Sequence, residues 1–362
     1  MILFIILFVM LGLIIPANLY FCPYVKIYTN MFDLYNIDYE IISLNKDGME
    51  ENVSFHFDYS IKGTSSLVKK LCCYYTYSRF VKRIVRNRKY DKLIIFGPQI
   101  GLFLYSFLRK KYNRNFIFDY RDLSIDQYCQ RRFNDLLKIS SINVISSPGF
   151  EKLLPDGHEY ILSHNFDISL VRSAISQKCQ LKKCDYFTVL TIGGIRDYEA
   201  NVQVIDALKN RSDFSIYFIG KGVASEPLRK YCLNNDIENA HFKGFYQKQE
   251  EKDYILSSDV INIFYPRKRS HDTAISNRFY NALIYKKPMI TTVNTIQGDY
   301  VEKYKLGCAV KDCYNLAEDI KLFYRSINSS DFLSNCTKLL TEFEADYCAF
   351  ERAVLNFIKN EC

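Results

Sequence analysis

Short apolar runs alternate with longer amphipathic stretches along most of the chain. The short runs predict buried strands, because an unbroken apolar segment suits a strand that is covered on both faces. In the first half of the chain the predicted strands are Asp38–Leu44, Lys92–Phe96, Asn115–Asp119, Ile142–Ser146 and Tyr160–Ser163. In the second half they are Phe187–Ile192, Phe214–Ile219, His241–Gly244, Val260–Tyr265 and Pro288–Thr292.

The stretches between these strands predict helices, because their apolar residues recur at three- and four-residue spacing. Examples are Tyr24–Tyr35, Asn201–Lys209, Glu226–Asn234, Asn277–Lys286 and Ala317–Ser326. Strands and helices in alternation indicate βαβ units and parallel sheets. The predicted strands are too numerous for one compact sheet, so the pattern favours two sheets.

A polar stretch, Ser169–Cys184, separates the two sets of strands and has no strand pattern of its own. We therefore predict an α/β protein of two Rossmann-like, doubly wound parallel-sheet domains that face a cleft, with ligands at the carboxyl ends of the strands. The N-terminal domain covers 1–168, the linker 169–184 and the C-terminal domain 185–340. Residues 341–362 are interpreted as a C-terminal helix that could pack back on the N-terminal domain.

The first fifteen residues, Met1–Ile15, carry no charge and allow two interpretations. As a helix they would span roughly 22 Å, which is short of the roughly 30 Å of a bilayer's hydrocarbon core. A signal peptide begins with positive charge, whereas the first basic residue here is Lys26. We favour a buried parallel strand at Ile2–Val9, and an N-terminus inserted in the membrane is the alternative.

Composition narrows the class of protein. Of 362 residues, 48% are hydrophobic and 24% are charged, which is typical of a globular protein and excludes extended disorder. The net charge of +8 suits phosphate-bearing ligands or an anionic membrane surface and is too small for a nucleic-acid coat. The 12 cysteines include no C-x-x-C pair, so they indicate buried thiols in a reducing cytoplasm rather than a metal or redox motif.

Glycine-rich turns follow two strands of the second half. Gly193 and Gly194 come after the first, with Arg196 just beyond, and Gly220-Lys221-Gly222 comes after the second. Glycine lets a ligand approach the backbone because no Cβ stands in the way. The planar guanidinium of Arg196 could bridge two phosphate oxygens.

Further along, Ser276 precedes a predicted helix and is a good N-cap. The free amides and positive dipole of such a helix end form a ready site for a diphosphate. Each of these features is common by itself, as a tight turn, a simple cap or a solvated cation. Their fixed order along the chain is what favours a binding site.

That order resembles a known family. The order of five motifs resembles that in the nucleotide-sugar-binding domain of GT-B-fold glycosyltransferases of the family 4 type. In this chain the motifs are Gly193-Gly194-Ile195-Arg196, Ile219-Gly220-Lys221-Gly222, Phe242-Lys243-Gly244, Ser258-Asp259-Val260…Pro266 and Ser276–Leu283. The resemblance is strongest over residues 185–310. It implies a nucleoside-diphosphate sugar as donor, no cofactor, no metal and retention of anomeric configuration. The donor-binding residues that it implies are Gly193, Gly194, Arg196, Gly220, Lys221, Thr273, Ser276, Asn277, Arg278 and Asn281.

The sequence also departs from that family. Many members carry two glutamates eight positions apart, one toward the donor sugar and one toward the ribose, where this chain has Thr273 and Asn281. Lys286 stands where the helix usually ends in glycine. A catalytically weak or non-catalytic subunit that supports a partner transferase, and a nucleotide-sugar epimerase of the same architecture, are therefore alternatives.

The N-terminal half resembles acceptor-binding domains of family members that assemble polysaccharides. Its candidate catalytic residues are Asp119, Asp122 and His164, each at the end of a predicted strand. Arg121 could instead pair with one of these carboxylates, and His164 could be a hydrogen-bonded wall of the site. The expected reaction is sugar transfer to a saccharide or lipid-diphosphate-linked acceptor in bacterial surface (capsular) polysaccharide synthesis.

The stretch Lys69–Lys92 mixes many basic residues with aromatic and aliphatic ones at helical spacing. Such a helix could lie on an anionic membrane, which would place the enzyme in the cytoplasm at the inner face of the cytoplasmic membrane. An outer helix with an ordinary solvated basic face is the other interpretation. No nucleic-acid recognition motif accompanies the charge, so nucleic acid is not an expected partner.

Overall fold

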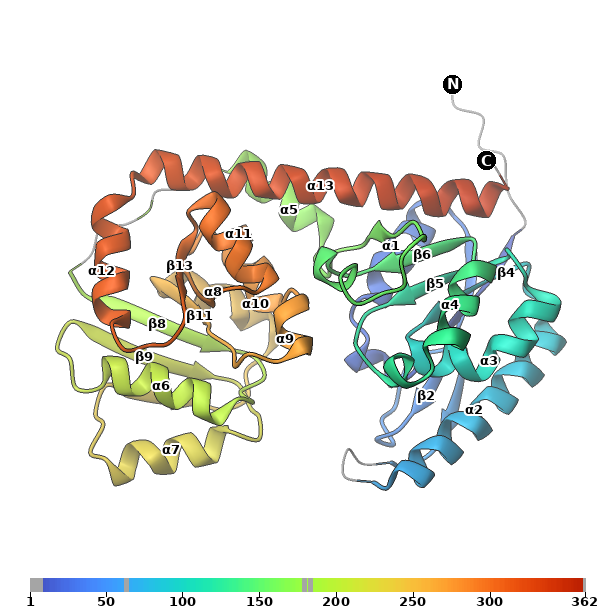
Figure 1. Ribbon diagram of the computed structural model, residues 1–362, viewed down its shortest axis with the longest axis horizontal. Coiled ribbons are helices and arrows are strands. Elements are labelled where there is room, and N and C mark those ends of the chain that lie inside the picture. The colour runs from blue at the N-terminus through green and yellow to red at the C-terminus, as the bar shows by residue number, and fades with distance from the viewer. Residues whose placement is uncertain (1–8, 62–64, 178–180, 182–184, 361–362) are drawn as a thin grey trace. The chain divides into compact units, whose positions relative to one another are not determined.

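The computed structural model describes residues 9–61, 65–177, 181 and 185–360 (Figure 1). The chain forms two compact units. The N-terminal unit contains the described residues up to Asn165 and those from Asp346 onward, and the C-terminal unit is Phe166–Ala345. Each unit is a parallel sheet with helices on both faces, so the predicted fold class, two Rossmann-like α/β domains, is confirmed.

The sheet of the N-terminal unit has the order β3-β2-β1-β4-β5-β6-β7, with every pair parallel. Its strands are β1 (Met10–Ile14), β2 (Asp38–Asn45), β3 (Phe55–Asp58), β4 (Lys92–Phe96), β5 (Phe116–Tyr120), β6 (Ile142–Ile145) and β7 (Ile161–Leu162). Its helices and 3₁₀ turns are η1 (Leu19–Phe21), α1 (Val25–Leu34), α2 (Leu67–Arg88), α3 (Pro98–Lys111), η2 (Ile125–Tyr128), α4 (Gln130–Ile139) and η3 (Pro148–Phe150).

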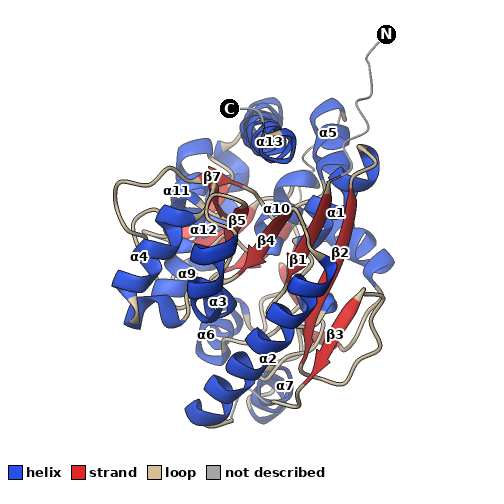
Figure 2. Cartoon of the chain, turned by 90° about the vertical axis from the view of Figure 1, so that its right-hand side faces the viewer, coloured by secondary structure: helices blue, strands red, loops and turns tan. Residues whose placement is uncertain are grey.

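Side chains alternate between the two faces of this sheet, as the strand period requires. Ile117 of β5 joins an apolar cluster with α1, whereas the next residue, Phe118, lies under α3 and α4, close to Gly101. Helices α2 and α3 run side by side in Figure 2. The two layers fix the carboxyl ends of the strands at one edge of the unit.

The long helix α13 (Ser329–Lys359) begins in the C-terminal unit, and its last part belongs to the N-terminal unit. There Phe350 and Val354 are fully buried against α1 and the sheet. Lys92 donates from Nζ to the carbonyl of Phe357 and, at 2.6 Å, to Asn360 Oδ1. A buried cation thus meets the negative end of the helix dipole, although burial lowers the pKa of Lys92.

The sheet of the C-terminal unit has the order β10-β9-β8-β11-β12-β13, again all parallel. Its strands are β8 (Phe187–Ile192), β9 (Phe214–Ile219), β10 (Ala240–Lys243), β11 (Val260–Ile263), β12 (Met289–Thr292) and β13 (Gly307–Val310). Its helices and 3₁₀ turn are α5 (Ile168–Ser176), α6 (Tyr198–Leu208), α7 (Ser225–Asn234), η4 (Lys248–Glu250), α8 (Glu251–Ser257), α9 (Arg269–Thr273), α10 (Asn277–Ile284), α11 (Ile296–Tyr304) and α12 (Leu316–Ser326).

Two apolar clusters cover the faces of this second sheet. Phe187 and Val189 of β8 pack with α6, α7 and α12 on one face. Leu190 and Ile192 of the same strand pack with α10, α11 and the first part of α13 on the other. The alternation explains why β8 appears in the sequence as a continuous apolar run.

Most predicted strands lie within one or two residues of the observed ones, but one predicted strand falls mostly outside the described residues and two observed strands were not predicted. The apolar N-terminal run does supply a buried parallel strand, but that strand is β1 at Met10–Ile14. Val9 precedes it, and residues 2–8 of the predicted strand lie outside the described residues. Strands β3 and β13 were not predicted. In β3 half-buried positions alternate with exposed ones, and β13 has only four residues, most of which have small side chains.

The proposed linker is not uniformly irregular. Residues 168–176 form α5, whose Val171 and Ala174 are buried in the core of the C-terminal unit. Asp167 caps this helix by accepting from the backbone amide of Ser169 at 2.9 Å. Within the described part of the chain, no helix is both long enough and apolar enough to cross a bilayer.

Candidate functional site

In the C-terminal unit the chain reverses its direction of winding between β8 and β11. From β8 the strand order runs one way to β9 and β10, and from β11 it runs the other way to β12 and β13. Doubly wound sheets bind ligands where the strand order reverses, at the carboxyl ends of the two central strands. The loops after Ile192 and Ile263 therefore mark the candidate site, which also contains the turn after β9 and the start of α10.

The glycines at this edge are required mainly by backbone packing. Gly193 has φ +93° and donates its amide to Ile219 O at 2.8 Å. A Cβ on Gly220 would lie 2.1 Å from Gly193 O, and one on Gly222 would lie 2.0 Å from Ile195 O. The two turns thus touch backbone to backbone, where only glycine fits. Gly194 differs, because it is exposed and the atoms nearest to a Cβ there belong to the side chain of Arg196, at 3.4 Å or more.

Arg278, in the first turn of α10, is buried and serves the same turn. Its Nε donates to Ile192 O at 2.5 Å, and its Nη2 donates to Gly194 O at 2.7 Å. Its guanidinium also lies over the ring of Tyr265, 5.7 Å from the centroid. Through these two hydrogen bonds Arg278 orients the backbone of the turn after β8 and connects the start of α10 to the end of that strand.

Ser276 is the N-cap of α10, as predicted from the sequence. Its Oγ accepts from the amide of Phe279 at 3.4 Å. Gln297 of α11 accepts from both the amide and the hydroxyl of Ser276, at 3.0 and 2.7 Å. This buried glutamine gives the cap one orientation, so the positive end of the helix dipole is held at the strand ends.

Exposed cations also lie in the loops at this edge of the sheet. Arg196 and Lys221 are both exposed, and among the described residues neither has a hydrogen-bond or ion-pair partner. Lys268, in the loop after β11, pairs at 3.0 Å with Asp197. The site is therefore positive and holds unpaired charge at its surface, which suits a ligand with more than one phosphate.

The positions that correspond to the family's glutamates have different environments. Thr273 is buried, and its hydroxyl donates to the carbonyl of Arg269 at 2.9 Å. Asn281 is half-buried on α10, and in the described part of the chain its side-chain amide has no partner. Asn277, the first residue of α10, is exposed. Asn281 is therefore a partly accessible amide without a hydrogen-bond partner among the described residues.

A buried polar network shapes the loop after β11. Asn262 donates to Thr191 Oγ1 at 2.9 Å and accepts from the amide of Phe264 at 3.0 Å. Thr292 exchanges hydrogen bonds with the backbone of Tyr265, at 3.0 and 2.6 Å. These contacts direct the loop toward α9 and α10. Sequence reasoning missed Asn262, Gln297 and Lys268, although the basic run after Pro266 was a visible signal for the last of these.

In the N-terminal unit, Asp119 is part of an internal ion pair. It is fully buried, and Arg121 binds it through two bonds, Nε to Oδ1 at 2.5 Å and Nη2 to Oδ2 at 2.7 Å. The hydroxyl of Tyr28 also donates to Asp119 at 2.7 Å, and burial raises the pKa of Tyr28 well above its ordinary value. The structural pairing weighed in the sequence is therefore present, and Asp119 has no exposed oxygen for a substrate.

His164 and Asp122 differ in burial. His164 is buried, with Nε2 3.0 Å from Asp346 Oδ2 on α13, and burial lowers its pKa below the ordinary value. Arg121, whose charge also disfavours protonation, lies in the same cluster. Asp122 is exposed, so of the three predicted catalytic residues it alone is accessible to solvent.

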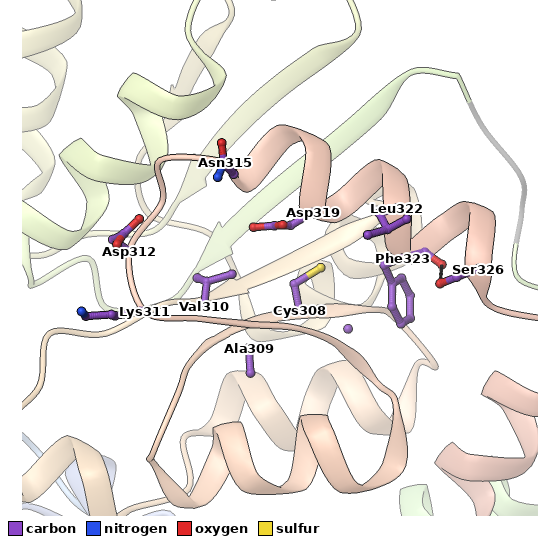
Figure 3. A pocket seen from close by; sticks show the side chains of 11 residues that line it. Cys308, Ala309, Val310, Lys311, Asp312, Asn315, Asp319, Leu322, Phe323 and Ser326 are labelled. Carbon is purple, nitrogen blue, oxygen red and sulfur yellow. Dashed lines mark hydrogen bonds between the residues drawn. The ribbon is translucent and has the colours of Figure 1, made fainter.

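Two cavities lie away from this edge. One, of about 510 Å³, lies between β13 and α12, and its walls include Cys308, Asp312, Asp319 and Phe323 (Figure 3). Burial raises the pKa of Asp319, a sign that charge is poorly solvated there, and its acidic lining does not suit a diphosphate. The other, of about 440 Å³, lies beside Lys92 and the end of α13.

Comparison with solved structures establishes the architecture. The chain superposes on sucrose-phosphate synthase from Thermosynechococcus elongatus with a TM-score of 0.69 and 10% identity, over 98% of this chain and 100% of the other. Anabaena HepE in complex with UDP gives 0.61 and 12% identity over 96% and 100%. UDP-GlcNAc 2-epimerase from Methanocaldococcus jannaschii gives 0.58 and 12% identity over 93% and 99%.

These identities are low, so the likeness shows the fold alone. The fold is GT-B, shared by glycosyltransferases and by at least one epimerase group. No protein-family model and no curated protein sequence matches the chain. Function must therefore be argued from the residues at the strand ends.

Proposed function

We propose that the protein is a glycosyltransferase that moves a sugar from a nucleoside-diphosphate sugar to a saccharide or lipid-linked acceptor, in the synthesis of a bacterial surface polysaccharide. One observation carries the proposal. The oriented N-terminus of α10 and the unpaired guanidinium of Arg196 lie at the edge where the sheet of the C-terminal unit reverses its strand order. A diphosphate is the ligand that satisfies both.

The chemistry follows from this charge. Transfer breaks the bond between the anomeric carbon and the diphosphate, and negative charge develops on the leaving oxygen. Fixed dipoles and cations that face this oxygen stabilise the transition state. We assign that role to the first turn of α10, to Arg196 and to Lys221, and we propose that no metal ion is needed. Retention of configuration is proposed from the family resemblance.

The nucleotide is proposed to lie with its ribose near Asn281, because the side-chain amide of Asn281 is available there. UDP is the first nucleotide to test, since the solved HepE complex contains it. Asp122 is the proposed acceptor-side residue, because it is the exposed residue of the predicted set. Asp119 and His164 are assigned to the support of the N-terminal unit.

A second candidate function is a non-catalytic or weakly active subunit that binds the nucleotide for a partner transferase. The observation that favours it is the pair Thr273 and Asn281, where carboxylates would be expected. An epimerase of the same architecture is the third candidate, and the structural likeness to UDP-GlcNAc 2-epimerase supports it.

The test is a panel of UDP, GDP, ADP and CMP, with their sugar conjugates, added to the purified chain during thermal unfolding. A ligand at one hundred times its Kd stabilises the folded state by about 2.7 kcal/mol, which is a clear rise in Tm. We expect one nucleoside diphosphate to act selectively, with slow release of that nucleotide from its sugar conjugate. Binding without release would favour the subunit, and conversion of UDP-GlcNAc into a second nucleotide sugar would favour the epimerase. Absence of any shift in a folded sample would contradict all three.

A further inference from the structure

Helix α2 carries an exposed face that changes character along its length. The residues of this face recur at three- and four-residue spacing, and all of them are exposed: Val68, Cys72, Tyr75, Arg79, Arg83 and Arg86. The opposite face, with Cys73, Tyr77, Val81 and Val85, is buried. The outward face is therefore apolar in its first third and cationic over the rest.

The apolar end is unusually exposed. Leu67, Val68, Leu71 and Tyr75 have 67, 69, 42 and 54% of their surface accessible. Such a cluster on one helix end is costly in water and marks a contact surface. It adjoins the carboxyl end of β2, because Lys46, the residue after that strand, donates from Nζ to Tyr74 OH at 2.9 Å.

Helix α2 itself contains no acidic residue, and of its cations Arg88, at the C-terminal end, pairs with Glu40 of β2 at 2.5 Å. Helix α2 contains only basic charges, at Lys69, Lys70, Arg79, Lys82, Arg83, Arg86 and Arg88. Helix α3, which packs beside it, adds Arg109, Lys110 and Lys111 and is also free of acid. On this surface the pKa of Lys82 is lowered, first by burial and then by the like charges of the nearby Arg86 and Arg132.

We propose that this face of the N-terminal unit docks on an anionic lipid bilayer, with Leu67, Val68, Leu71 and Tyr75 entering the interface and Arg79, Arg83 and Arg86 contacting lipid phosphates. Aliphatic side chains next to a row of cations suit a bilayer, where apolar burial and headgroup attraction act together. A nucleic acid would leave the aliphatic end without a partner. A second copy of the chain would bring cation against cation.

The surface lies beside the strand ends at which the N-terminal unit would bind an acceptor. A bilayer there would present a lipid-linked acceptor, and this part of the inference rests on the proposed function. Membrane docking itself does not, because it needs no nucleotide. Failure of docking and failure of sugar transfer are therefore separate results.

The first experiment measures co-sedimentation of the full chain with vesicles made of equal parts of phosphatidylcholine and phosphatidylglycerol, against vesicles of phosphatidylcholine alone. Binding is expected only to the anionic vesicles and should fall with added salt. The variant Arg79→Gln/Arg83→Gln/Arg86→Gln should bind about 100-fold more weakly, at about 1 kcal/mol for each cation. Leu67→Ser/Val68→Ser/Leu71→Ser should bind at least about tenfold more weakly.

Two control variants change the C-terminal unit by the same amounts. Lys230→Gln/Lys252→Gln/Arg325→Gln removes the same net charge, and Leu233→Ser/Leu256→Ser/Leu322→Ser removes as many exposed aliphatic side chains. Both should bind as the unaltered chain does. Equal loss in the controls, equal binding to uncharged vesicles, or full binding by both α2 variants would overturn the proposal. So would binding to a short RNA duplex with none to vesicles, which would reassign the surface.

The second experiment uses the absence of tryptophan from the sequence. Tyr75→Trp places a single reporter at the apolar end of α2, and Tyr314→Trp places one at a position 90% exposed in the C-terminal unit. Anionic vesicles should shift the emission of the Trp at position 75 to shorter wavelength and leave the other unchanged. No shift at position 75 in vesicle-bound protein would overturn the proposed insertion.

Discussion

His164 Nε2 lies 3.0 Å from Asp346 Oδ2, and this contact joins the two separate segments of chain that build the N-terminal unit. His164 comes at the end of the first segment, directly after the last strand. Asp346 is the first residue of the second segment, on α13. The imidazole is buried, while the carboxylate is 36% exposed. The histidine therefore acts as a support that attaches α13 to the sheet.

The contact predicts a pH dependence of stability. Burial lowers the pKa of His164 in the folded protein below the ordinary value of 6.5, so the unfolded chain binds this proton more readily. Stability from this group is therefore full above about pH 6.5 and is lost as the pH falls toward the folded pKa, at about 1.4 kcal/mol for each pH unit between the two values.

The measurement compares urea unfolding of the unaltered chain and of His164→Gln across that pH range. Glutamine can still donate to Asp346 but does not titrate, so the variant should lose less stability on acidification. His158, whose pKa burial also lowers, is present in both proteins, and its effect cancels. Identical slopes for the two proteins would contradict this prediction.

Because Asp119 and Arg121 form a buried ion pair, we expect substitution of Asp119 to lower the stability of the protein and not only its activity. Asp119→Asn keeps the shape but leaves a buried guanidinium without its counter-charge, which should cost about 3–5 kcal/mol in the free energy of unfolding. Asp122→Asn, at an exposed position, should change it by less than about 0.5 kcal/mol and instead lower the transfer rate. A stable but inactive Asp119→Asn protein would return Asp119 to the catalytic candidates.

The sequence predicted the fold far better than the site. Long apolar runs located β8 and β9 to the residue, because strands buried on both faces leave no ambiguity of pattern. The edge strand β3 was missed, because half its residues face solvent and its pattern resembles a loop. Residue type alone did not separate Asp119, locked in an ion pair, from Asp122, exposed three residues later.

For the donor-side residues, the sequence identified the turns but not the reason for each residue. The second glycine turn was interpreted as room for a ligand, whereas Gly220 and Gly222 make room for the neighbouring backbone. Arg278 was expected among the donor-binding residues, and in the structure its guanidinium donates to two backbone carbonyl groups. The role of each of these residues depends on contacts between segments far apart in the chain, and the local sequence pattern carries no information on such contacts.

Gly220→Ala should destabilise the C-terminal unit. The added Cβ would meet Gly193 O at 2.1 Å, and the residue has φ +125°, a conformation that alanine rarely adopts. We expect a loss of at least about 2 kcal/mol in the free energy of unfolding. Gly244→Ala is the matched control, because its Cβ would meet only the side chain of Lys221 at 3.8 Å. If both variants lost little stability and by the same amount, the two turns would be able to move apart at little cost in free energy, which would contradict this prediction.

Arg196 and Arg278 should respond differently to the same substitution. Arg196→Gln removes an exposed, unpaired charge, so it should weaken UDP binding about tenfold and leave stability unchanged. Arg278→Gln removes the donor to Ile192 O and Gly194 O and should lower the free energy of unfolding by about 1–3 kcal/mol. Titration calorimetry and urea unfolding separate the two effects. Lys230→Gln controls for net charge, and if it weakened UDP binding equally, Arg196 would have no specific role.

Asn281→Glu should strengthen nucleotide binding. The amide of Asn281 has no partner among the described residues, so the change costs no internal contact, and a carboxylate accepts a hydrogen bond from a ribose hydroxyl more strongly than an amide does. About 1 kcal/mol of added binding corresponds to about fivefold in Kd by calorimetry. Thr273→Glu should fail instead, because that position is buried and the charge would be desolvated. With a 2′,3′-dideoxy analogue of UDP the gain should vanish, and a gain that persisted would place Asn281 away from the ribose.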